Sequence, residues 1–123
     1  MKLQQGKVHL PSSCNESRGQ AEETLDLPEG VPPLRSLQLY LSNGCNLKCR
    51  HCWVSSKYLG TKPEPCDLID LDLLAAAVAE ARTLGLYRAV LTGGEPLLHP
   101  RFREIVDMLC EEGLYLCLVT NGT

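Results

Sequence analysis

The sequence predicts an α/β domain with the element order βαβαβ and parallel strands over residues 34–123. Two observations support this fold class. Apolar segments of strand length alternate with segments whose apolar residues recur every three or four positions, as they do in amphipathic helices. Each strand-like segment also runs directly into a short motif rich in cysteine, glycine or asparagine. Strands joined through helices are parallel, so the three motifs are expected at one edge of the sheet, where ligands bind in α/β proteins.

The first unit begins with an expected strand at residues 36–42, SLQLYLS, in which leucines alternate with other residues. After a long connection, a helix is expected to start near Asp67 or Asp70, because either carboxylate can cap a helix N-terminus. Gly85 is expected at the end of this helix. Apolar residues at spacings of three and four predict the buried face, which comprises Leu71, Leu74, Ala75 and Val78.

The second unit begins with YRAVLTGGEP, residues 87–96, which predicts a short apolar strand entering a glycine turn. The next segment, HPRFREIVDMLCEEG at residues 99–113, predicts a helix with Pro100 in its first turn and Gly113 at its end. The apolar stripe of this helix comprises Phe102, Ile105, Val106 and Leu109.

The last segment, LYLCLVTNGT at residues 114–123, predicts a third strand that is apolar on both faces. Such a run is typical of a parallel sheet covered on both sides. By contrast, residues 1–33 are rich in polar residues, glycine and proline, and are expected to form a poorly ordered segment ending in a stiff linker, LPEGVPP. Cys14 lies in this segment and is expected to be a free surface thiol.

Composition narrows the class of protein. The chain has 123 residues, is 44% hydrophobic and carries a net charge of −3, which gives no reason to expect nucleic acid or a membrane surface as partner. No apolar run is long enough to span a bilayer, and no secretory signal is evident, so a cytoplasmic location is expected. Seven cysteines fit poorly with a disulfide framework in that compartment, and a metal or cluster is the better expectation.

The strongest motif is CNLKCRHC at residues 45–52, which places three thiols in one loop after the first strand. Lys48 and Arg50 add positive charge beside them, which favours metal binding by the anionic thiolates. A structural zinc needs four ligands, and in a zinc-binding module the fourth would be Cys66 or His51. A 4Fe–4S cluster held by three cysteines instead keeps one iron free for a substrate or cofactor.

The cysteine spacing CxxxCxxC, together with GGEP after the second strand and TNG after the third, resembles the radical S-adenosylmethionine (radical SAM) superfamily. The opening SLQLYLSNGCNLKCRHCW is especially similar to peptide-modifying members with a C-terminal SPASM extension. The resemblance implies a partial, TIM-like (β/α)6 barrel, of which residues 34–123 would form the first half of the core domain. It thus implies a fragment, a truncated frame or one piece of a split enzyme.

The resemblance also implies the roles of individual residues. Three cysteines would ligate a 4Fe–4S cluster, and S-adenosylmethionine (SAM) would chelate its fourth iron. Glu95 would accept a hydrogen bond from the SAM ammonium group, and the glycines before it would let the backbone approach the methionyl part. His51 would contact the adenine. The implied cluster ligands are Cys45, Cys49 and Cys52, and the implied SAM-binding residues are Gly93, Gly94, Glu95, Pro96, His51, Thr120 and Asn121.

The activity implied by this family is reductive cleavage of SAM to a 5′-deoxyadenosyl radical that abstracts hydrogen from a substrate, with peptide or protein modification as the expected branch. Its implied partners are an electron donor such as flavodoxin or ferredoxin, a peptide substrate and a chain that completes the barrel. Two other interpretations remain open, a zinc-binding interaction module and a catalytically inactive remnant. Of the remaining cysteines, Cys66 is expected to be an idle thiol, and Cys110 and Cys117 are expected to be packing residues.

Overall fold

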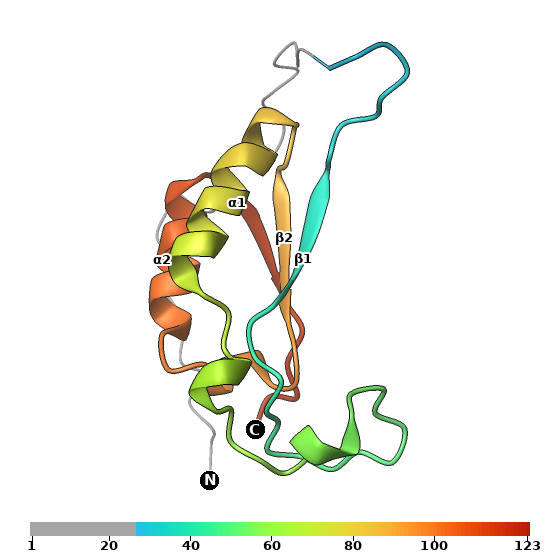
Figure 1. Cartoon of the computed structure of the whole chain (residues 1–123), viewed down its shortest axis with the longest axis vertical. Helices are drawn as coiled ribbons and strands as arrows, with labels where there is room; N and C mark the ends of the chain where they lie inside the picture. The colour runs from blue at the N-terminus through green and yellow to red at the C-terminus, as the bar shows by residue number, and fades with distance from the viewer. Residues whose placement is uncertain (1–26) are drawn as a thin grey trace, which may run out of the picture.

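A computed structural model describes residues 27–123 of the chain (Figure 1). Three strands, β1 (Ser36–Tyr40), β2 (Arg88–Thr92) and β3 (Tyr115–Leu118), form one parallel sheet in the order β1-β2-β3. The register is continuous across the sheet, since Leu39 pairs with Leu91 and Leu91 with Leu118. The predicted α/β class, the element order and the parallel strands are therefore confirmed.

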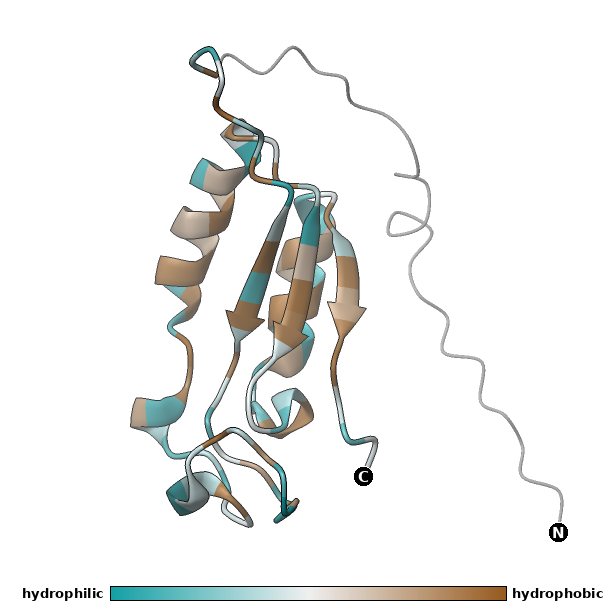
Figure 2. Ribbon diagram, turned by 90° about the vertical axis from the view of Figure 1, so that its right-hand side faces the viewer, coloured by the Kyte–Doolittle hydropathy of each residue, from teal (hydrophilic) through white to brown (hydrophobic). Residues whose placement is uncertain are grey.

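Two helices connect the strands, α1 (Leu71–Thr83) and α2 (Phe102–Glu111). Both lie against the same face of the sheet, as Figure 2 shows. Three single-turn 3₁₀ segments lie in the connections after β1 and β2 and are labelled η2 (Ser56–Tyr58), η3 (Pro65–Asp67) and η4 (Pro96–Leu98). This repeated strand–helix order, with the helices on one side, is the arrangement of a partial (β/α) barrel.

Local residue chemistry sets the helix ends. The Asp70 carboxylate accepts a hydrogen bond from the Leu73 amide at 2.8 Å and so caps the start of α1. Gly85 follows the helix with a φ of 97°, a conformation that glycine adopts without strain. The prediction that Pro100 lies in the first turn of this helix is wrong, because α2 begins at Phe102 and Pro100 precedes it. The chain first forms a turn in which the Phe102 amide donates to the His99 carbonyl at 3.0 Å.

The apolar core lies between the sheet and the two helices. One prediction about its membership is wrong, because Ala75 is exposed and Ala81 is buried in its place. With α1 starting at Leu71, the residues one turn apart that meet the sheet are Leu74, Val78 and Ala81, and Ala75 points away. The buried core comprises Leu39, Leu41, Leu74, Val78, Ala81, Leu86, Ala89, Leu91, Ile105, Leu109 and Leu114.

The second face of the sheet carries no helix in residues 27–123, so the expected cover on both sides is not found there. Gln38, Val90 and Cys117 form one row across this face. The apolar side chains beside the sheet ends remain accessible, with Tyr115 49% and Val119 56% exposed. The physical reason is that consecutive crossovers place their helices on one side, and in a barrel the other side faces the interior.

None of the helices in residues 27–123 combines the length and the apolar character that a membrane crossing requires. Residues 1–26, which include Cys14 and most of the expected N-terminal segment, lie outside the described residues. The linker residues that are described contain a turn in which the Val31 amide donates to the Pro28 carbonyl at 3.1 Å.

Candidate functional site

The carboxyl ends of the three strands meet at one edge of the sheet, and the three motifs follow them there. In Figure 2 the strand arrowheads point toward the loops that gather at this edge, and the C-terminus lies there as well. We call residues 42–46, 93–96 and 120–123 the rim. Backbone hydrogen bonds join its first two segments, from the Gly94 amide to the Ser42 carbonyl and from the Glu95 amide to the Gly44 carbonyl, both at 2.9 Å.

Gly93 and Gly94, the two glycines of the rim that follow β2, are required by contacts within the chain itself. A Cβ atom on Gly94 would overlap the carbonyl oxygens of Asn43 and Gly44, and one on Gly93 would overlap that of Ser42. Gly93 also has a φ of 142°, which residues with a side chain rarely adopt. The absence of side chains at these two positions therefore lets the loop after β2 pack directly against the loop after β1.

Glu95 is the buried centre of the rim. It has no exposed surface, and its carboxylate accepts three hydrogen bonds from the chain. Oε1 accepts from the Leu97 amide at 3.0 Å and from the Thr120 hydroxyl at 2.8 Å, and Oε2 accepts from the Asn121 amide at 2.9 Å. A buried carboxylate is stable only when it is hydrogen-bonded in this way. Glu95 therefore ties the segment after β3 to the segment after β2.

The three cysteines of the loop differ in exposure. Cys45 is 8% exposed at the base of the loop, Cys52 is half-buried and Cys49 is exposed. Backbone hydrogen bonds hold Cys45 on both sides, from its own amide to the Tyr58 carbonyl at 3.1 Å and from the Thr61 amide to its carbonyl at 2.9 Å. The Cys52 amide donates to the Cys49 carbonyl at 3.2 Å, which closes a turn between those two thiols.

The sulfur of Cys45 accepts two hydrogen bonds. The Leu47 amide donates to it from within the loop at 3.4 Å, and the Asn121 side-chain nitrogen donates to it from the end of the third strand at 3.8 Å. Asn121 also donates to the Asn46 side-chain oxygen at 2.9 Å. The structure thus brings the cysteine loop, GGEP and TNG into one connected network, as their positions after the strands predict.

The donor set of the loop is three thiols, the set that leaves one iron of a 4Fe–4S cluster without a protein ligand. In the part of the chain that the structure describes, no three His, Cys, Asp or Glu side chains are grouped so that they could hold one metal ion. The zinc-binding interpretation, with Cys66 or His51 completing the set, therefore gains no support from the geometry. Ligands of a 4Fe–4S cluster bind separate irons and stand farther apart. Three thiols in one loop, one of them buried and hydrogen-bonded, suit that larger group.

The remaining predicted site residues lie at or near the rim. His51 is exposed within the loop, and Pro96 is buried as the first residue of η4. Trp53, next to Cys52, is 72% exposed and packs edge-on against Tyr40, with ring centroids 5.5 Å apart. The other cysteines of residues 27–123 belong to other segments, with Cys66 exposed in η3, Cys110 buried in α2 and Cys117 half-buried in β3.

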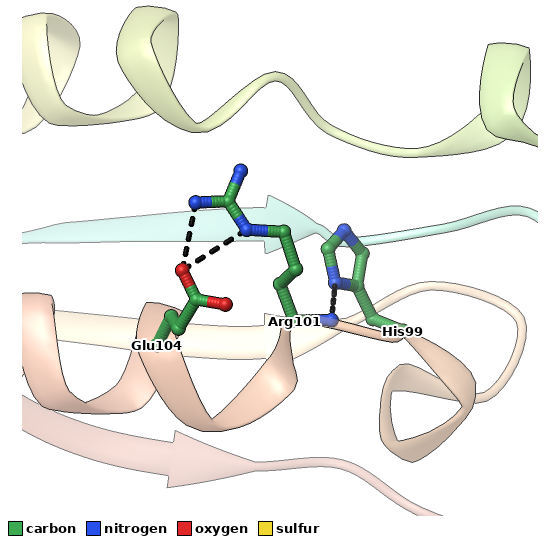
Figure 3. A network of polar contacts seen from close by, with 3 residues as sticks. All are labelled: His99, Arg101 and Glu104. Atoms are coloured by element: carbon green, nitrogen blue, oxygen red, sulfur yellow. Dashed lines mark hydrogen bonds and ion pairs between the residues drawn. The ribbon is translucent and has the colours of Figure 1, made fainter.

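His99 is a buried group of this region that the sequence indicates only as a residue near a helix start. Its side chain is 3% exposed, and Nδ1 accepts a hydrogen bond from the Arg101 amide at 3.1 Å (Figure 3). Nε2 has no hydrogen-bond partner within the described residues. Burial lowers the pKa of His99, a shift that the nearby Arg101 guanidinium reinforces, while the Ile69 backbone and Glu104 oppose it. Burial therefore favours the neutral form of the imidazole.

Fold and rim together define an α/β protein of the partial-barrel type whose strand ends carry a cysteine-rich ligand loop. The profile of the Radical SAM superfamily matches residues 39–123, and the chain belongs to this superfamily. Enzymes of this superfamily use a 4Fe–4S cluster and SAM. The predicted family and its cofactors are thereby confirmed.

Several curated proteins are similar to this chain. The antilisterial bacteriocin subtilosin biosynthesis protein AlbA of Bacillus subtilis is 32% identical over 83 residues, which cover 68% of this chain and 17% of that protein. The AdoMet-dependent heme synthase of Methanosarcina barkeri is 36% identical, with coverages of 68% and 23%. The GTP 3′,8-cyclase of Aquifex aeolicus is 34% identical, with coverages of 73% and 28%. The chain therefore spans less than a third of the length of these relatives.

Proposed function

We propose that this chain binds a 4Fe–4S cluster through Cys45, Cys49 and Cys52, binds SAM at the rim, and supports radical chemistry on a peptide or protein substrate. The observation that carries the proposal is the hydrogen-bonded link between the three strand ends. Glu95 holds Asn121 at 2.9 Å, and Asn121 reaches the sulfur of Cys45. A residue of the proposed SAM site and a ligand of the proposed cluster are thus parts of one network.

The SAM site would use both charge and close backbone approach. Glu95 keeps a second acceptor position on Oε2, since that oxygen accepts only one hydrogen bond from the described residues, and an ammonium donor suits it. His51 is exposed on the loop, where it can contact a planar ring. The residues that we propose for the SAM site are Gly93, Gly94, Glu95, Pro96, His51, Thr120 and Asn121.

When bound, the cluster and SAM supply a one-electron cleavage that gives methionine and a 5′-deoxyadenosyl radical, the hydrogen-abstracting species. The chain's own residues have a different task. They hold three thiolates at one strand end, keep the carboxylate of Glu95 away from water and fix the loop against the sheet. Such a fixed arrangement is what a reactive intermediate needs.

Anaerobic reconstitution with iron and sulfide tests the cofactor proposal. The protein should become brown, contain about four irons and four labile sulfides per chain, as a 4Fe–4S cluster requires, and show a reduced-cluster electron paramagnetic resonance (EPR) signal that changes when SAM is added. Cys49→Ser should abolish the signal, whereas Cys66→Ser is the matched control outside the loop and should retain it. A colourless chain, or one zinc without sulfide, would refute the proposal.

We propose that the substrate is a peptide or protein, which the enzyme modifies. This proposal is supported by the order of the cysteine loop, GGEP and TNG along the chain and by the similarity to a bacteriocin biosynthesis protein. Similarity to a GTP cyclase and a heme synthase favours other substrates. Incubation with a uniformly deuterated peptide library should place deuterium in 5′-deoxyadenosine, because the radical abstracts from the substrate. Deuterium transfer from labelled GTP instead would contradict the peptide branch.

The proposed activity also needs partners. We propose a flavodoxin or ferredoxin as electron donor, a chain or segment that completes the barrel, and a reducing compartment such as the cytoplasm. The competing interpretation is an inactive remnant that keeps the fold but not the chemistry. Production of 5′-deoxyadenosine by the reconstituted chain with dithionite would exclude the remnant. Its absence in a chain that holds an intact, SAM-responsive cluster would favour it.

A further inference from the structure

We propose that Asn121 is a positioning residue for the cysteine loop, and that the N–H group it donates to the Cys45 sulfur raises the reduction potential of the bound cluster. This inference rests on the proposed function, since it assigns a role toward a sulfur that would ligate iron. The two residues are 76 positions apart in the chain, so only the fold brings them together.

The orientation of the Asn121 amide follows from its partners. Its Oδ1 accepts hydrogen bonds from the Thr123 backbone amide at 3.0 Å and from the Thr123 hydroxyl at 2.9 Å. A backbone N–H can only donate, so the amide oxygen must face Thr123. The amide nitrogen must then face the loop, where it donates to Asn46 Oδ1 at 2.9 Å and to Cys45 Sγ at 3.8 Å. If the amide were reversed, its NH₂ group would face the Thr123 backbone N–H, and two donors would be opposed.

The backbone of this segment is fixed independently of the side chain. The Asn121 amide donates to Glu95 Oε2 at 2.9 Å, and the Thr120 hydroxyl donates to Oε1 at 2.8 Å. Glu95 is fully buried, and its own amide donates to the Gly44 carbonyl at 2.9 Å, one residue before Cys45. The contacts thus close a ring from Gly44 through Glu95 and Asn121 to Cys45. A donor held in such a ring loses little freedom when it meets the sulfur.

A hydrogen bond to a ligand sulfur has a defined electronic effect. It withdraws electron density from the cluster and favours the more negative, reduced state. Because Cys45 is only 8% exposed, the sulfur is surrounded by protein donors more than by water. The Leu47 amide supplies the other donor, and as a backbone group it is not altered by substitution. Asn121 is therefore the position at which a side-chain change acts on this sulfur.

The test is an anaerobic redox titration of the reconstituted 123-residue chain, followed by EPR. Asn121→Ala should lower the ratio of reduced to oxidised cluster at a fixed potential by up to about tenfold, which corresponds to ~59 mV for one electron. Asn121→Asp keeps the size and the acceptor oxygen but removes the donor, so it should lower the potential at least as far. Asn46→Ala, which leaves the donor to sulfur in place, should stay near the wild-type potential.

Two results would overturn the inference. One is a wild-type potential in both Asn121 variants at full cluster content, and the other is an equal shift in Asn46→Ala, which would indicate general loosening of the loop. A second measurement needs no cluster. In the iron-free chain, alkylation followed by peptide mapping should show Cys45 reacting faster in Asn121→Ala than in wild type, because the sulfur loses a side chain that contacts it and no charge is added beside it, with Cys117 unchanged.

Unchanged alkylation of Cys45 would refute the positioning role. The two measurements also separate this inference from the proposed function. A chain that binds no iron defeats the proposed function, while the alkylation rates still decide whether Asn121 holds the loop. A chain with a normal cluster and an insensitive potential defeats only the inference.

Discussion

The face of the sheet covered by the helices and the rim are stabilised in different ways. Under the helices, eleven apolar residues from two strands, two helices and their connections are buried against one another. At the rim, contact is made by backbone carbonyls, amides and one buried carboxylate, with Gly93 and Gly94 admitting no side chain. Apolar burial is non-directional and tolerates some repacking, whereas the rim depends on directional hydrogen bonds between close backbones.

This difference indicates how the chain combines a stable scaffold with an irregular, polar site. The helix-covered face supplies the free energy that holds the strands in register. The rim then needs only to place a few atoms correctly, because the strand ends are already fixed. Substitutions in the core should therefore lower the free energy of unfolding, whereas substitutions at the rim should mainly impair the site. The following predictions, from the largest expected effect to the smallest, test that contrast.

Leu109→Ala should have the largest effect, because Leu109 is fully buried in the core on α2. The lost burial and the cavity should lower the free energy of unfolding by about 3–4 kcal/mol, measured by urea denaturation followed by circular dichroism. The folded structure of the core and of the rim should be lost together, and iron uptake should be lost with them. Leu97→Ala, at a position that is 43% exposed, is the control and should change little. Wild-type iron uptake by Leu109→Ala would contradict the dependence of the rim on the core.

Gly94→Ala should break the rim more than the core. The new methyl group would overlap the carbonyls of Asn43 and Gly44, so the loops must separate, at a cost of about 1–3 kcal/mol. Iron uptake should fall while most of the helical signal remains. The matched control is Gly113→Ala, where a Cβ meets nothing within 4 Å and only the positive φ of 71° causes strain, about 1 kcal/mol. Equal iron uptake by the two variants would argue against the close approach.

Asp70→Ala should lower the stability of the helix-covered scaffold and leave the site unchanged. The variant loses the hydrogen bond from the Leu73 amide that caps α1, at a cost of about 1 kcal/mol. Cluster content and EPR signal should remain those of the wild type, while the midpoint of urea unfolding shifts to lower concentration. Asp72→Ala, in the same first turn but without this cap, should have a smaller effect. A cluster lost in Asp70→Ala would indicate that the two regions are not separable.

Acidification should have the smallest effect, acting through His99. Burial lowers its pKa below the ordinary value of about 6.5, so the unfolded chain binds the extra proton more readily. The free energy of unfolding should therefore be highest above pH 6.5, fall as the pH drops through the lowered pKa, and then level off. His99→Asn, which keeps an acceptor for the Arg101 amide, should flatten this pH dependence in urea denaturation. An unchanged slope would show that other groups cause it.

Much of the fold could be predicted, because strand and helix periods are local properties of the sequence. Alternating leucines define β1, and Asp70 and Gly85 define the ends of α1. Ala75 and Pro100 were misplaced because the rotation and first residue of a helix depend on small differences in capping. That both helices lie on one face follows from chirality and curvature of the whole sheet, which no single segment of sequence contains.

The residues of the site could be named from their motifs, but their contacts could not. That the cysteine loop, GGEP and TNG lie at one edge follows from parallel strands. That Glu95 bonds to Thr120 and Asn121, and that Asn121 reaches Cys45, depends on side-chain positions brought together by the fold. Asn46 and His99 carry no sequence signal of their roles, since an exposed asparagine and a histidine before proline are ordinary loop residues.

The ring that links the strand ends has a consequence for the order of folding. Its contacts join residues that are 26 and 76 positions apart, so they cannot form until the sheet has closed those long loops. The cysteine loop is therefore expected to mature late, and the thiols meet solvent while the chain emerges and collapses. If the three thiols take up iron as proposed, oxidants present during that interval would compete with it, and an oxygen-free, reducing environment should matter during folding as well.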